Sequence, residues 1–118
     1  MQTLIIVLVA LHVVAGVFWA GSTWALARAG GESAHKLFRP QMGAATLAIL
    51  AGIGLWSILH RGARGPMEAT LALGALFAIA AVSVQGALRR KSPLLSQRIA
   101  AGLLAVTVLC MATARYVG

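Results

Sequence analysis

Four side chains that could bind a metal occur in or beside long apolar stretches of this chain: His12, His60, Cys110 and Met111. His12 is the most informative, because an imidazole at membrane depth is costly and usually persists when it binds or pairs with something. Gly16 and Trp19 follow at spacings of four and three residues, which place them on the helical face of His12. We therefore expect His12 to ligate a metal centre, with Gly16 leaving room beside the ring and Trp19 forming a flat wall.

The planar group that would use these features is haem, whose two axial ligands must lie at nearly equal depth. At a rise of about 1.5 Å per residue, His60 lies roughly 12 Å closer to the outer face than His12. We therefore expect His60 to be a polar interfacial residue beside Trp56, or a ligand of a separate, shallower haem or metal site. Met111 is about one helical turn from the depth of His12, and Cys110 precedes it. Methionine can ligate haem iron, and both sulfur groups suit cuprous ion.

Three other roles for His12 stay open on the sequence alone. It could ligate copper together with Met111 or Cys110, or it could relay protons. It could also be a neutral imidazole that hydrogen-bonds to a hydroxyl on another helix. Thr107 lies at a similar depth in the last apolar run, and Ser57 is somewhat shallower in the second.

The elements that must position these residues follow from the composition. The chain has 118 residues, of which 60% are hydrophobic and 10% are charged, with a mean hydropathy of +0.90. Its apolar runs approach or exceed the roughly 20 residues that span a bilayer; they cover residues 4–27, 42–59, 69–88 and 99–117. We predict an all-α fold with one integral membrane domain over residues 1–118. Its helices should cover about residues 3–28, 34–61, 66–90 and 93–117, and short connections predict an up-down-up-down bundle.

Small residues and prolines refine this prediction. Ala44, Ala48 and Gly52 recur at four-residue spacing on the second predicted helix, where they would let neighbouring helices approach closely. Pro66 should begin the third helix and Pro93 the fourth, since proline is favoured in the first helical turn.

The formal net charge of +8 is distributed unequally over the two ends of the predicted bundle. One end receives seven basic residues, namely Arg28, Lys36, Arg39, Arg89, Arg90, Lys91 and Arg98. The other end receives three, namely Arg61, Arg64 and Arg115. Short loops rich in Lys and Arg stay in the cytoplasm, so we expect an inner (plasma) membrane protein with both termini outside. The basic loops should meet anionic lipids rather than nucleic acid.

The sequence also excludes several classes of enzyme. Two acidic residues are too few for paired-carboxylate acid–base catalysis. The chain holds no Ser-His-Asp arrangement and no P-loop, and it shows no polar track that would suggest a fluoride channel.

The string His12-x6-Trp19-x-Gly21 resembles the superfamily that includes the copper-resistance protein D membrane domain and the HemJ-type protoporphyrinogen oxidases. Residues 36–42 and 48–56 are similar to the second helix of HemJ-type proteins, so the resemblance covers about the first half of the chain. It implies a small helical bundle that handles haem b with His12 as ligand, or metal uptake in the copper branch. Residues 22–27 depart from the HemJ-type pattern and the lysine of its third helix is absent. Porphyrinogen oxidation is therefore not carried over.

These features predict a haem-b-binding integral membrane protein with a redox or haem-handling role, such as a membrane haem oxidoreductase or an electron-transfer protein. Its cofactor site would contain His12, Gly16, Trp19 and Met111. The metal-ligand candidates are His12, His60, Met111 and Cys110. Because four short helices barely enclose a macrocycle, we expect a homodimer. The alternatives are a copper-handling membrane protein and a non-catalytic accessory or oligomerising subunit.

Overall fold

Four long helices make up the structure. The computed structural model describes residues 1–30, 34–60, 62 and 64–117, is 89% helical, and has no strand among those residues. Its helices are α1 (Gln2–Arg28), α2 (Ala34–Leu59), α3 (Pro66–Leu88) and α4 (Pro93–Thr113), followed by the short 3-10 helix η1 (Ala114–Tyr116). The predicted all-α fold with four helices is therefore confirmed. Pro66 and Pro93 begin α3 and α4 as expected.

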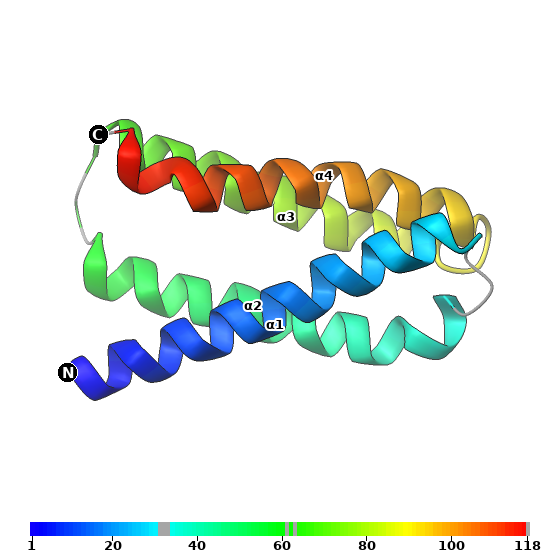
Figure 1. Ribbon diagram of the computed structural model, residues 1–118, viewed down its shortest axis with the longest axis horizontal. Helices are drawn as coiled ribbons and strands as arrows, with labels where there is room; N and C mark the ends of the chain where they lie inside the picture. Colours follow the sequence, from blue (N-terminus) through cyan, green and yellow to red (C-terminus); the bar gives the residue numbers. More distant parts are fainter. Residues whose placement is uncertain (31–33, 61, 63, 118) are drawn as a thin grey trace.

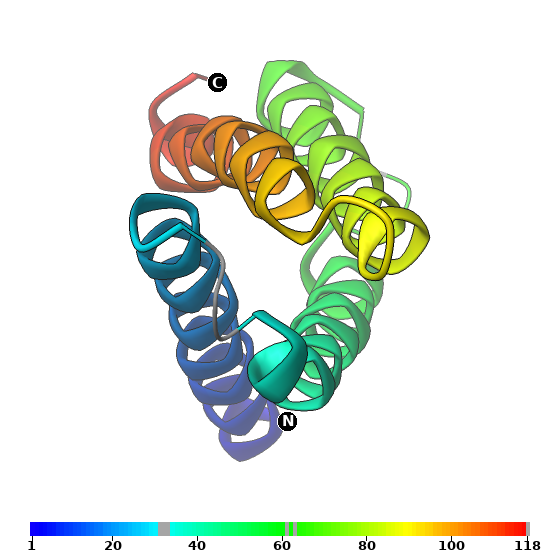
Figure 2. The same ribbon diagram turned by 90° about the vertical axis from the view of Figure 1, so that its right-hand side faces the viewer.

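The helices are arranged as two pairs. Helix α1 packs along α2 and α3 packs along α4, and the pairs meet mainly where α1 contacts α4 (Figures 1 and 2). Consecutive helices run in opposite directions in Figure 1, so both chain ends lie at the same end of the molecule. The longest dimension is 41 Å, which exceeds the roughly 30 Å of a bilayer's hydrocarbon core.

The outer surface of the helices is apolar. All four helices are long and apolar enough to cross a membrane. On α1, the exposed fractions of Val13, Val14 and Val17 are 53%, 70% and 66%. An extended apolar surface of this kind marks contact with lipid or with another protein. The fold therefore supports a multi-pass membrane protein.

Small residues bring the helices together in the interior. Ala45, Ala48 and Ala100 are buried in the core. A Cβ atom added at Gly74 of α3 would lie 2.9 Å from the Cβ atom of Cys110 on α4, so this contact requires glycine. Close backbone approach gives membrane helices the dispersion contacts that hold them together. The predicted packing role of Ala48 is confirmed.

The basic residues are concentrated at one end of the molecule. The seven residues assigned to one side lie at the end of α1, the start of α2, the end of α3 and the start of α4. We call this the basic end, on the right in Figure 1, and we call the opposite end, with both chain termini, the terminal end. Arg64 and Arg115 lie at the terminal end, while Arg61 is outside the described residues.

Candidate functional site

His12 lies in the interface between α1 and α2. Its Nδ1 atom is 2.7 Å from the backbone carbonyl oxygen of Ala48. One turn further along α2, a Cβ atom added at Gly52 would lie 3.0 Å from Cε1 of the His12 ring. The small side chains at positions 48 and 52 therefore let the imidazole pack directly against the α2 backbone.

The contact with Ala48 determines the tautomer of His12. A carbonyl oxygen can only accept a hydrogen bond, so Nδ1 must carry the proton and donate it. In a neutral imidazole the lone pair then resides on Nε2. Metal-ligating histidines are commonly oriented in this way, with one ring nitrogen bonded to a carbonyl and the other facing the metal.

The hydroxyl groups considered as partners of His12 bond elsewhere. Thr107 donates to the carbonyl oxygen of Gly74 at 2.9 Å, and Ser57 donates to that of Ile53 at 3.0 Å. The prediction of a hydroxyl partner is therefore wrong. The small residues beside the ring let it bond to a backbone carbonyl on the adjacent helix instead.

Gly16 and Trp19 differ sharply in their surroundings. A Cβ atom added at Gly16 would meet no heavy atom within 4 Å, so the helical face beside His12 is open there. Trp19 is only 3% exposed and its Nε1 donates to Oε1 of Gln85 at 2.7 Å. Gly16 thus lies on an uncontacted part of the α1 surface, whereas Trp19, which was expected to form a flat wall, is instead part of the packed core.

His60 lies at the terminal end of α2 and pairs with Glu68 at the start of α3. The distance between His60 Nδ1 and Glu68 Oε2 is 2.6 Å. The centroids of the His60 and Trp56 rings are 5.5 Å apart. This position matches the polar interfacial role expected for His60 beside Trp56.

Met111 and Cys110 pack between α4 and α3. A Cβ atom added at Gly74 would lie 3.3 Å from Cε of Met111 and 2.9 Å from Cβ of Cys110. His12 instead contacts α2. The structure therefore places the two sulfur groups and the imidazole in different helix pairs.

The metal-ligand candidates do not form one cluster. Among the residues that the structure describes, no group of three or more His, Cys, Asp and Glu side chains could hold a metal ion. His12 and His60 each use Nδ1 in a hydrogen bond, with the Ala48 carbonyl oxygen and with Glu68 Oε2 respectively, so in both rings the described hydrogen bonds leave Nε2 unused.

A second buried polar site was not predicted. Gln41 of α2, Gln85 of α3 and Gln97 of α4 meet Thr23 and Trp19 of α1, and we call these five residues the amide cluster. Thr23, Gln41 and Gln85 are fully buried, and Gln97 is 3% exposed. Every helix contributes a side chain to this cluster, which lies toward the basic end of the bundle rather than along its whole length.

The amide cluster satisfies its own hydrogen-bonding groups. Gln85 Nε2 donates to Thr23 Oγ1 at 2.9 Å, and Gln41 Nε2 donates to the same oxygen at 3.1 Å. Gln41 Nε2 also lies 3.2 Å from Gln97 Oε1. Thr23 in turn donates to the Trp19 carbonyl oxygen at 2.7 Å. The sequence did contain one signal for this cluster. Gln85 is an amide inside the third apolar run, and a polar side chain at membrane depth is costly and usually pairs with something, as was argued for His12.

Comparison with known proteins adds no family to this geometry. No family model, curated protein or solved structure matches the chain. The resemblance of His12, Trp19 and Gly21 to haem- and copper-handling membrane proteins stays a prediction, and the function must be argued from the geometry.

Proposed function

We propose that this chain is an integral membrane protein that binds haem b through Nε2 of His12 and serves in electron transfer or haem handling. The observation that carries the proposal is the 2.7 Å contact between His12 Nδ1 and the Ala48 carbonyl oxygen. This contact orients the ring and directs the lone pair to Nε2, as in other histidines that ligate metals. Haem would supply a reversible one-electron couple.

Two glycines near His12 support this assignment, because neither has a side chain that would fill the space next to it. Gly52 allows the ring to seat against α2, and Gly16 leaves open space on the same face of α1. The string His12-x6-Trp19-x-Gly21 adds the resemblance to haem-handling membrane proteins. His12 would be the residue of this chain that holds the haem iron, since Met111 packs against α3.

A homodimer completes the proposal. The Gly16 surface is open and the neighbouring valines of α1 are exposed, so a group held beside His12 on this surface would face lipid in a single copy. A second copy across this surface would exclude lipid from the other side. The distribution of basic residues further favours an inner-membrane orientation with the basic end in the cytoplasm.

Absorption spectroscopy tests the assignment. The full chain, purified in detergent and supplied with haem, should show a Soret band that His12→Ala abolishes. His60→Ala is the matched control, because it removes an imidazole that pairs with Glu68 at the terminal end, and it should retain the band. Absence of the band in the unaltered chain, or an equal band in His12→Ala, would contradict the proposal.

The same preparations separate the alternatives. Copper handling predicts bound copper that falls in a Met111→Ala/Cys110→Ala variant, as measured by metal analysis. An accessory subunit predicts that His12→Ala changes neither haem nor copper content. Among the residues that the structure describes, no contact favours copper, because the sulfur groups and His12 lie in different helix pairs.

A further inference from the structure

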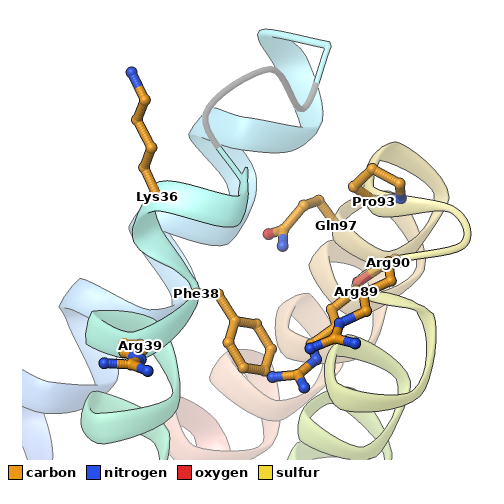
Figure 3. Close-up of a pocket in the computed structure, with 8 residues that line it drawn as sticks. Lys36, Phe38, Arg39, Arg89, Arg90, Pro93 and Gln97 are labelled. Carbon is orange, nitrogen blue, oxygen red and sulfur yellow. The ribbon is translucent and has the colours of Figure 1, made fainter.

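A pocket of about 280 Å³ opens at the basic end, between the start of α2, the end of α3 and the start of α4 (Figure 3). Four of the eight described residues that line it are Lys or Arg, and none of these eight is acidic. In Figure 3 the charged groups of Arg89 and Arg90 lie beside Phe38, whereas those of Lys36 and Arg39 point away from it. A concave surface lined by charges of one sign focuses the potential and attracts an ion of the opposite sign. The pocket is therefore suited to an anion.

An aromatic contact holds one of these cations in the pocket. The guanidinium carbon of Arg89 lies 4.7 Å from the centroid of the Phe38 ring. Figure 3 shows the side chains of Arg89 and Arg90 beside that ring. A cation over an aromatic face is restrained by the ring quadrupole, so the charge is partly positioned before any ligand binds.

The buried hydroxyl of Ser96 is an independent indication that the pocket binds a ligand. It lines the pocket, it is 1% exposed, and its hydroxyl makes no hydrogen bond to any described residue. Buried polar groups are nearly always bonded, and an unbonded one reduces stability. An anion in the pocket would accept a hydrogen bond from Ser96 and remove that deficit.

The pocket also lies at the N-terminal end of α4, a helix of 21 residues that begins at Pro93. The positive end of the helix dipole favours negative charge at this position. Gln97 lines the pocket and also belongs to the amide cluster, where it bonds to Gln41 and Gln85. The pocket and the amide cluster are therefore adjacent.

We propose that this pocket binds a phosphate group, with Arg89 and Arg90 supplying charge and Ser96 and Gln97 supplying hydrogen bonds. Three oxygens on a phosphate match the guanidinium and hydroxyl donors present. The phosphate can belong to an anionic phospholipid headgroup or to a soluble phosphate. The site is separate from His12, so it holds whether or not the chain binds haem.

Equilibrium binding to the full chain in phosphate-free buffer tests the site. One arm uses nanodiscs of phosphatidylcholine with added phosphatidylglycerol, and the other uses inorganic phosphate. Arg89→Gln should weaken binding of the effective probe about tenfold or more. Arg64→Gln is the matched control, because it removes the same charge from the terminal end and should leave affinity unchanged.

Ser96→Ala provides a second test, in which thermal stability and ligand affinity should change in opposite directions. Without ligand it removes an unbonded buried hydroxyl, so its midpoint of thermal unfolding should rise, while its affinity should fall about threefold to tenfold. Binding of phosphatidylglycerol alone identifies a lipid headgroup, and binding of inorganic phosphate identifies a soluble ligand. The proposal is overturned if neither probe binds, if Arg64→Gln weakens binding as much as Arg89→Gln, or if Ser96→Ala leaves affinity unchanged.

Discussion

The amide cluster and the surroundings of His12 are both polar sites inside apolar helices, but they use their hydrogen-bonding capacity differently. In the amide cluster, the side chains of Gln41 and Gln85 are fully buried and bond to neighbours in the same cluster. His12 is only partly buried, and the hydrogen bonds of the described residues use its Nδ1 alone. A polar group whose partners are all internal stabilises a fold, whereas a ring nitrogen with an unused lone pair keeps the capacity to accept a further bond.

The strongest test of this contrast is the removal of Gln85. Gln85→Ala breaks bonds to Trp19 and Thr23 and leaves a buried space, so we expect the free energy of unfolding to fall by about 2–4 kcal/mol. Denaturant titration in detergent, followed by circular dichroism, measures the change. Ser83→Ala on the same helix removes an exposed hydroxyl that bonds within its own helix and should change stability by less than about 0.5 kcal/mol. Equal stabilities for the two variants would refute the structural role of the cluster.

Two glycine substitutions beside His12 should have opposite effects. The Cβ atom of Gly52→Ala would lie 3.0 Å from the ring, so the imidazole must move and stability should fall by about 1–3 kcal/mol. Gly16→Ala meets nothing within 4 Å and should raise stability by about 0.5–1 kcal/mol, because alanine favours the helix. Thermal unfolding of both variants in the same detergent gives the comparison. The described geometry is wrong if Gly16→Ala is the more destabilising change.

Removal of His12 should perturb the fold less than removal of Gln85. His12→Ala deletes one hydrogen bond, to Ala48, and we expect a loss of about 1 kcal/mol in the ligand-free chain. Nitrogen NMR of labelled histidine should show a protonated Nδ1 and an unprotonated Nε2. A proton on Nε2 in the ligand-free chain would remove the lone pair on which haem ligation depends.

The smallest effect is expected at the terminal end. Glu68→Gln removes the carboxylate charge from the 2.6 Å contact with His60, whose side chains are 19% and 15% exposed. The amide oxygen of glutamine can still accept the hydrogen bond, so the unfolding free energy should change by less than about 1 kcal/mol. Denaturant titration checks this value. A loss comparable to that of Gln85→Ala would place a third structural polar site in the molecule.

The helices could be predicted because their determinants are local. Pro66 and Pro93 are the first residues of α3 and α4, and the proline ring fixes a backbone angle that suits a helix start. The apolar runs between the loops are long enough to span a membrane. His12 could be selected because its polarity contrasts with its neighbours in sequence. Gln85 is likewise a polar residue among apolar neighbours. Its role could not be predicted, because its partners Gln41 and Gln97 lie near the starts of helices, where amide side chains are common.

The amino-acid sequence by itself determined the number, length and apolar character of the helices, since hydropathy and backbone preference act over a few neighbouring residues. Only the tertiary structure decided which polar groups meet. The acceptor for His12 is a backbone carbonyl 36 residues away, and every residue of the chain carries such a carbonyl, so no residue type marks it. Helix rotation and packing select one of them, and the same packing directs Met111 to α3 and brings four helices together around Gln85.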